Sequence, residues 1–322
     1  MDAGLRYDQL QRLGPRAPWR PLLGVLMLGA LVFGAQLVLS VLVGVVLFLT
    51  GTPLDEVGDE LLGDPVTPAF LALVNLGWAV AIPAVWLVGL ALHRQRPGWL
   101  ASVAGRIRWR WLLVCLGLSV LALLLTLGVA ALLPVEATEG MEADTGLNPW
   151  SSTVRDFVLV VLLLTPLQAA GEEYVFRGYL TQAFGGLFGR WGDRLGAVVA
   201  VVVPALLFAL AHGLGQDLPV FFDRFAFGLV AGTLVLLTGG LEAGIAMHVL
   251  NNFLAFGVAL AFGDMTAALN PTGGSWWTIL STLTQSVGYL LLALWGARRM
   301  GVLDRTTRSG GGAILEPRQR PV

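Results

Sequence analysis

Long apolar runs separated by short polar segments follow one another through the whole chain of 322 residues. About 20 consecutive apolar residues cross a bilayer as an α-helix. By that measure there are about eight candidate spans, at 21–49, 68–92, 111–133, 155–177, 196–212, 219–238, 243–262 and 276–296. Because hydrocarbon offers the backbone no hydrogen-bond partner, each span must be helical. The pattern predicts an all-α fold, a polytopic transmembrane helical bundle.

Composition supports this prediction, since 56% of the residues are hydrophobic, 13% are charged and the mean hydropathy is +0.76. The run at 21–49 is too long for the core of a signal peptide, so we expect it to be a retained span. The single cysteine, Cys115, excludes a disulfide or a cysteine-based zinc site within one chain. The net charge of -1 says nothing about partners; we expect contact with the lipid bilayer and with no nucleic acid.

The charges between the spans alternate in sign. Arginines precede the first span and lie between the second and third, whereas the loops after the first and third spans carry acidic residues and no arginine. Cytoplasmic loops are rich in Lys and Arg, so both termini are predicted to be cytoplasmic. All 20 basic residues are arginines, which is typical of a high-GC bacterial genome. We therefore expect a multi-pass protein of a bacterial inner (cytoplasmic) membrane.

The chain divides into three parts. Residues 1–150 comprise an N-terminal cytoplasmic segment and three spans, and residues 151–300 form a core that holds unusual polar residues. Residues 301–322, with "SGGG" and "EPRQRPV", are expected to be a disordered cytoplasmic tail.

Polar side chains inside spans are costly and point to function by default. They gather in the second half of the chain: Glu172, Glu173 and Arg177 in the fourth span, His212 in the fifth, Asp223 and Arg224 in the sixth, and His248, Asn251 and Asn252 in the seventh. The remaining histidine, His93, is expected to be solvated at a span end. Asp223 and Arg224 are interpreted as helix-packing residues or an interfacial pair.

Helical spacing sorts these residues further. Glu173 and Arg177 are four apart with the acid first, which favours an ion pair along one face. Glu172 points about 100° away and lacks a local partner, so it is the candidate general base. His248 and Asn252 share a face, while Asn251 turns aside. Imidazole and amide donors side by side are suited to stabilise an oxyanion.

Glu172 and His212 each lie 20 residues from Gly192. If the chain turns there, the two side chains lie at equal depth in an antiparallel hairpin. That places them about 30 Å from the turn, whereas His248 lies close to the "TGGLE" turn. The two depths agree only if the hairpin projects from the membrane or if the helices are broken.

The motifs resemble those of a known family. "EEYVFRG" is similar to EExxxR, "FALAH" to FxxxH and "HVLNN" to HxxxN of the CAAX prenyl protease and bacteriocin-processing (CPBP, or Abi) family of intramembrane proteases, in the family's order. The resemblance covers about Phe157 to Phe262.

The resemblance implies a role for each residue. Glu172 would activate water, with His212 assisting it or holding that water. His248 and Asn252 would stabilise the oxyanion, and Glu173 and Arg177 would form a supporting ion pair. The implied reaction is hydrolysis of a peptide bond in a membrane-associated, hydrophobic or prenylated peptide substrate.

Whether a cofactor takes part stays open at this point. Glu172, His212 and His248 could supply a two-histidine, one-carboxylate zinc site. There is no HExxH, and if His248 is an oxyanion donor too few ligands remain. We therefore favour a glutamate protease without a metal.

Two other classes of function are carried forward as alternatives. One is a proton-coupled transporter. The sequence shows no inverted repeats of the kind that mark transporters, which argues against this alternative. The other is a catalytically silent immunity or scaffold protein. The substrate itself is not readable from the sequence.

Overall fold

The computed structural model describes residues 4–15, 17–132, 146–213, 215–269, 274 and 276–307. Within these ranges the chain forms helices and no β-strand. In chain order they are η1 (Tyr7–Leu13), α1 (Trp19–Leu49), α2 (Leu54–Leu62), α3 (Pro68–His93), α4 (Pro97–Ala101), α5 (Trp109–Ala130), α6 (Ser152–Glu173), η3 (Tyr174–Leu180), α7 (Thr181–Phe188), η4 (Gly189–Trp191), α8 (Asp193–Ala211), α9 (Leu218–Thr238), α10 (Glu242–Phe262), α11 (Met265–Leu269) and α12 (Trp276–Met300).

Local sequence signals explain where several of the long helices begin. The side chains of Thr67, Ser151 and Asp217 each accept a hydrogen bond from the backbone N–H three residues later, at the starts of α3, α6 and α9. Such N-caps satisfy donors that have no partner inside the helix. Proline follows in the first turn of α3 and α9, where its missing N–H costs nothing.

Seven described helices are long and apolar enough to cross a membrane, and they coincide with the first seven predicted spans. The eighth predicted segment is the helix α12, which packs along α5 and α9. The prediction of an all-α, polytopic bundle is therefore confirmed.

The fourth span is longer than predicted. Instead of ending near residue 177, the helix runs from Ser152 to Trp191, 40 residues, and passes through a π-helical stretch at η3. A straight helix of this length would measure about 60 Å, roughly twice the hydrocarbon thickness. The chain then turns at Gly192, whose φ of 144° suits glycine. Whether this hairpin projects from the membrane, as one of the two explanations for the depths of Glu172 and His248 requires, stays a prediction.

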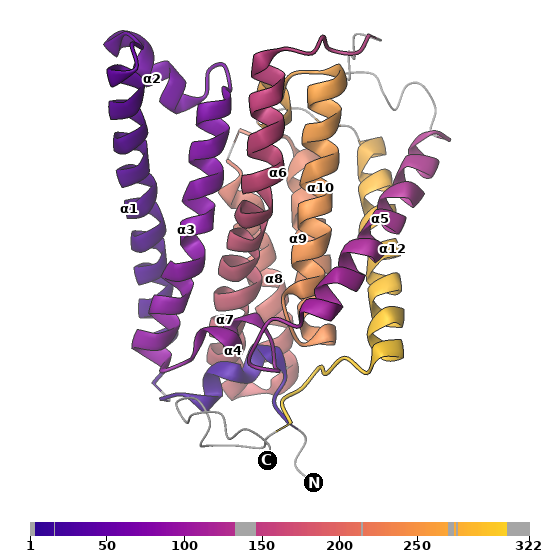
Figure 1. The fold of residues 1–322 in the computed structure, drawn as a ribbon. Coiled ribbons are helices and arrows are strands. Elements are labelled where there is room, and N and C mark those ends of the chain that lie inside the picture. Colours follow the sequence, from indigo (N-terminus) through magenta and orange to yellow (C-terminus); the bar gives the residue numbers. More distant parts are fainter. Residues whose placement is uncertain are drawn as a thin grey trace, which may run out of the picture.

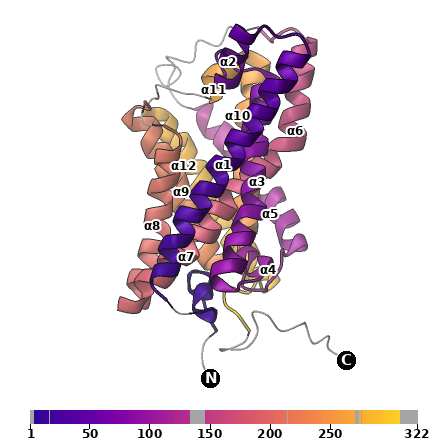
Figure 2. The same ribbon diagram turned by 90° about the vertical axis from the view of Figure 1, so that its left-hand side faces the viewer.

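The helices form one bundle with the candidate residues at its centre. Figure 1 shows α1 and α3 on one side, α5 and α12 on the other, and α6, α8, α9 and α10 between them. In that arrangement α3 packs on α6, α10 packs on α5 and α6, and α8 packs on α9. The spans of the first 150 residues thus enclose the core directly. Helix α1 lies at the outside of the bundle (Figure 2), with side chains such as Phe33 exposed.

The two ends of the described chain meet at one end of the bundle. The backbone N–H of Leu5 donates to Oγ1 of Thr306 at 3.0 Å, and the N–H of Thr306 donates to the carbonyl of Leu5 at 2.9 Å. The tail predicted to be disordered from residue 301 is therefore held in place up to residue 307, because its backbone groups pair with the N-terminal segment. Residues 308–322 lie outside the described residues, and the side of the membrane stays a prediction.

His93 differs from the prediction of a solvated side chain. It is 2% exposed, and its Nε2 lies 2.9 Å from the hydroxyl of Tyr179. The reason is tertiary: Tyr179 lies on η3, far along the chain. Cys115 is fully buried in the core, as befits a small hydrophobic side chain.

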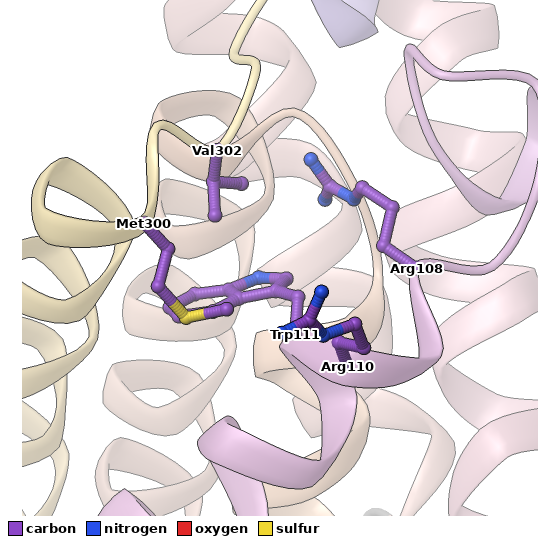
Figure 3. A pocket seen from close by; sticks show the side chains of 5 residues that line it. All are labelled: Arg108, Arg110, Trp111, Met300 and Val302. Atoms are coloured by element: carbon purple, nitrogen blue, oxygen red, sulfur yellow. The ribbon is translucent and has the colours of Figure 1, made fainter.

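A buried ion pair joins the starts of α5 and α10. Nη2 of Arg108 lies 2.6 Å from a carboxylate oxygen of Glu242. Arg108 also lines a pocket of about 410 Å³ together with Arg110, Trp111, Met300 and Val302 (Figure 3). That pocket contains no candidate site residue.

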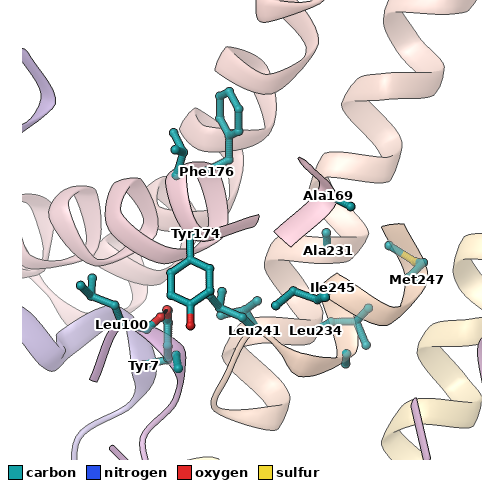
Figure 4. Packing of buried hydrophobic residues seen from close by; sticks show 14 of the residues in the cluster. Tyr7, Leu100, Ala169, Tyr174, Phe176, Ala231, Leu234, Leu241, Ile245 and Met247 are labelled. Carbon is teal, nitrogen blue, oxygen red and sulfur yellow. Dashed lines mark hydrogen bonds between the residues drawn. The ribbon is translucent and has the colours of Figure 1, made fainter. Parts of the chain in front are cut away.

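Apolar packing fills the space between this end of the bundle and the candidate site. Figure 4 shows Tyr174 of η3 beside Leu241 and Ile245, with Tyr7 and Leu100 below. All five side chains are buried in one cluster. The cluster joins the N-terminal segment, η3 and α10 into one core.

Close approach of α6 to α3 generates a prediction about Gly171. A Cβ at this position would lie 1.9 Å from the backbone carbonyl oxygen of Trp78, so Gly171→Ala forces the two helices apart. Overpacking of this kind costs about 1–3 kcal/mol. We expect a lower thermal midpoint for Gly171→Ala in detergent micelles. The matched control is Gly257→Ala on α10, where a Cβ has nothing within 4 Å; equal midpoints for the two variants would contradict the close contact.

Candidate functional site

Glu173 is the centre of a buried group of charges. Nη1 of Arg177 lies 3.1 Å from Oε1 of Glu173, which confirms the predicted ion pair. The same oxygen lies 3.0 Å from Nδ1 of His248, which comes from α10. Because a carboxylate only accepts hydrogen bonds, Nδ1 of His248 carries the proton and donates it. Glu173 is thus a partner of both the arginine and the histidine.

Aromatic rings enclose the arginine. The guanidinium carbon of Arg177 lies 4.1 Å from the ring centre of Phe208 on α8 and 5.6 Å from that of Phe227 on α9. Aromatic faces attract a cation, more strongly where water is excluded, and Arg177 is only 1% exposed. The ring of His248 packs edge-on against both phenylalanines. The rings therefore fix the distance between the arginine and the histidine.

Glu172 points in a different direction from Glu173 and has different partners. Its Oε1 accepts a hydrogen bond from Nε2 of Gln168, one turn earlier on α6. Its Oε2 lies 3.6 Å from Nε2 of His248, and within the described residues it accepts no hydrogen bond although it is buried. This oxygen is therefore free to accept a proton or a water molecule.

Asn252 approaches the same group from α10. Its Nδ2 donates to Oε1 of Gln168 at 3.0 Å, so Gln168 links Asn252 with Glu172. The neighbouring Asn251 turns away, as predicted, and accepts a hydrogen bond from Gln285 of α12 at 3.4 Å. The amide of Asn252 faces Gln168 on α6, and that of Asn251 faces Gln285 on α12.

His212 makes no hydrogen bond or ion pair with the two glutamates within the described residues. Helix α8 ends at Ala211, so His212 sits at its C-terminal end with an exposed side chain. Its Nδ1 donates to the carbonyl of Phe208 at 2.8 Å, which leaves Nε2 with a free lone pair. The ring of Phe208 contacts both His212 and His248, at 4.6 and 5.9 Å between ring centres. Phe208 is therefore a shared neighbour of the two histidines.

Asp223 and Arg224 do not form an ion pair with each other within the described part of the chain. Nη1 of Arg224 donates to Oε1 of Gln216 at 2.7 Å, and Gln216 in turn donates to the carbonyls of Ala209 and Gly213 at the end of α8. Arg224 therefore braces the end of α8 that carries His212.

Comparison with known proteins shows which family the centre of the chain resembles. Residues 154–254 match the family model described as type II CAAX prenyl endopeptidase Rce1-like. This part of the chain is similar to that family. The matched segment, called the Rce1-like region below, runs from α6 to α10 and contains all six predicted site residues. Together with the seven apolar helices, the match supports a multi-pass membrane protein that is similar to this protease family.

Two bacterial relatives extend the comparison. The chain is 36% identical over 98 residues to the membrane-embedded CAAX protease MroQ of Staphylococcus aureus (strain USA300), which covers 30% of this chain and 36% of MroQ. It is 23% identical over 258 residues to the uncharacterized protein YyaK of Bacillus subtilis (strain 168), which covers 74% of this chain and 79% of YyaK. No solved structure matches the chain.

The structure adds Gln168 to the residues of the Rce1-like site. It is 8% exposed and contacts both Glu172 and Asn252. A signal for it exists in the sequence, because it is a polar residue in an apolar run and lies four residues before Glu172. Its contact with Asn252 is not readable from the sequence, since the two residues lie on different helices.

Whether Glu172, His212 and His248 hold a zinc ion stays a prediction that the structure does not test. No group of three His, Cys, Asp or Glu side chains in the described parts of the chain is arranged to hold a metal ion. Nδ1 of His248 is engaged by Glu173, which leaves Nε2 as the nitrogen available to a ligand, and the ring of His212 contacts that of Phe208.

The buried ion pair generates a prediction about stability. Arg177→Met leaves the carboxylate of Glu173 buried beside His248 alone, and breaking a buried pair in this way costs about 3–5 kcal/mol. We expect unfolding in detergent at a much lower denaturant concentration. The double change Glu173→Gln with Arg177→Met removes both charges and is expected to recover part of the loss.

The exposed pair Arg155 and Asp156 provides the control. Arg155→Met is expected to change stability by less than about 0.5 kcal/mol, because solvent screens exposed pairs. A loss for Arg177→Met no larger than for Arg155→Met would show that the buried pair is not needed for folding.

Proposed function

We propose that the Rce1-like region is an intramembrane endopeptidase in which Glu172 activates the attacking water. The observation that carries the proposal is the buried Oε2 of Glu172, which accepts no hydrogen bond in the described chain and faces Nε2 of His248 at 3.6 Å. A water molecule beside both atoms would donate one proton toward the carboxylate. The family match and MroQ support peptide hydrolysis as the reaction.

The first chemical step is attack on the scissile carbonyl. Glu172 takes one proton from the water as general base, and the water oxygen bonds to the carbonyl carbon. The electron pair of the C=O bond moves to oxygen and forms an oxyanion. Nε2 of His248, when protonated, and the second N–H of Asn252 are the donors that would stabilise this charge.

The second step breaks the C–N bond. The oxyanion collapses to a carboxylic acid, and Glu172 returns its proton to the leaving amine. Glu173 keeps Nδ1 of His248 protonated throughout, because it accepts that hydrogen bond at 3.0 Å. His212, with a free Nε2, would hold the water or assist its deprotonation from the mouth of the site.

The proposed substrate is a hydrophobic, membrane-associated or lipidated peptide, since the site lies among spans and the family model is named for prenylated substrates. The proposed location is the cytoplasmic membrane of a bacterium, as both relatives are bacterial. Comparing the membrane proteomes of cells with the active protein and with the Glu172→Gln variant would identify the substrate.

Glu172→Gln tests the proposed base. Gln has nearly the same shape and cannot take a proton, so we expect the rate of peptide cleavage by the purified protein to fall by about 10²–10⁴-fold while the folded fraction is unchanged. The control is Glu56→Gln, an exposed position on α2. Cleavage by Glu172→Gln at the rate of the unmodified protein would rule out this mechanism.

The same variant separates the two other classes of function. A scaffold or immunity protein would keep its cellular phenotype with Gln at position 172. A proton-coupled transporter would lose transport without showing peptide cleavage in either form.

Metal content provides a separate test. We propose a glutamate protease that requires no metal, and expect full activity from purified protein with well under one equivalent of zinc by elemental analysis. Activity that rises in proportion to bound zinc would instead support Glu172, His212 and His248 as ligands.

A further inference from the structure

Gln168 connects the part of the site that lies on α6 with the part that lies on α10. It lies on α6, one turn before Glu172, and its Nε2 donates to Oε1 of that carboxylate. Its own Oε1 accepts a hydrogen bond from Nδ2 of Asn252 on α10 at 3.0 Å. The side chain is 8% exposed, so water does not compete strongly for either bond.

Chemistry fixes the orientation of this amide. An ionised carboxylate can only accept hydrogen bonds, so the NH₂ group of Gln168 must face Glu172. The oxygen of Gln168 then faces Asn252, which must present its own NH₂ group. Reversing either amide would place an oxygen against an oxygen or a donor against a donor. The orientation of Asn252 therefore follows from the charge on Glu172.

This orientation decides which atoms remain available. With Oε1 of Glu172 engaged by Gln168, Oε2 is the oxygen left to act, and it is the one that faces Nε2 of His248 at 3.6 Å. With one N–H of Asn252 engaged, the other N–H is left to donate. The contacts of Gln168 thus leave one acceptor available on α6, Oε2 of Glu172, and one donor available on α10, the second N–H of Asn252.

We propose that Gln168 is a positioning residue of the site, which holds the general base Glu172 and the oxyanion donor Asn252 in register across α6 and α10. The inference rests on the proposed function and deepens it, because Gln168 lies outside the three motifs that suggested that function. It does not touch the reacting atoms.

The competing explanation is that Gln168 only joins two helices, as polar side chains in membranes often do. The chain offers a matched control for that role. Gln285 of α12 is 5% exposed, and its Nε2 donates to Oδ1 of Asn251, the residue next to Asn252 on α10. It makes the same kind of Gln–Asn bond to the same helix without reaching Glu172.

The experiment compares Gln168→Met with Gln285→Met in purified protein, by thermal unfolding and by peptide cleavage. Methionine has a similar length and neither donates like an amide nor accepts strongly. We expect Gln168→Met to lower kcat by about 10–100-fold, as loss of an orienting hydrogen bond does at other sites, and to change KM by less than about threefold. Gln285→Met is expected to lower stability comparably and to leave kcat within about twofold.

A second variant keeps the test decisive if Gln168→Met does not fold. Gln168→Glu retains the shape and an acceptor for Asn252, but two buried carboxyl groups in contact share one proton, so Glu172 is no longer freely available as a base. We expect kcat to fall for this variant as well, because Glu172 is affected while the acceptor for Asn252 is kept. A kcat equal to that of the unmodified protein in folded Gln168→Glu or Gln168→Met, or an equal loss in Gln285→Met, would overturn the inference.

The two proposals fail in different ways. If Glu172→Gln cleaves peptide normally, the proposed function is wrong whatever Gln168 does. If Glu172→Gln is inactive and folded Gln168→Met is fully active, only the role of Gln168 is wrong.

Discussion

A single carboxylate oxygen organises the centre of this protein. Oε1 of Glu173 lies within 3.1 Å of Arg177 and 3.0 Å of His248, in a region where Glu173 is fully buried. A lone charge at such a position would be too costly to bury, and the attraction of an opposite charge offsets part of that cost. The arginine lies one turn away on the same helix, whereas the histidine must come from α10. The charged group is therefore complete only when α10 packs against α6.

Neighbouring glutamates acquire different properties from this arrangement. Glu173 is held by a cation and an imidazole, and Phe208 and Phe227 shield the cation from the other side. Glu172, one residue earlier, lies about 100° further around the helix. One of its oxygens accepts a hydrogen bond from the amide of Gln168, and the other accepts none within the described residues. The two carboxylates therefore have different neighbours, a cation and an imidazole for Glu173 and an amide for Glu172. Sequence adjacency is what allows two carboxylates to lie so close and yet face separate surroundings.

The enclosing helices make this polar centre compatible with a membrane. Helix α3 approaches α6 closely enough at Gly171 that only a hydrogen fits against the carbonyl of Trp78. Helices α5 and α12 cover α10 and α9 on the other side. The N-terminal spans are therefore part of the wall around the Rce1-like region.

The sequence by itself determined the helical class, the positions of the spans and the pairing of Glu173 with Arg177, because these depend on hydropathy and on spacing along one helix. The motifs also pointed to six residues that all fall within the Rce1-like region. Only the tertiary structure decided that His248 donates to Glu173, that Gln168 joins Glu172 to Asn252, that Phe208 contacts His248 and that His93 is buried against Tyr179. Each of these contacts depends on the distance and rotation between helices far apart in the chain, and the spacing of residues along a single helix carries no information about either. The structure also showed that the fourth helix continues to Trp191.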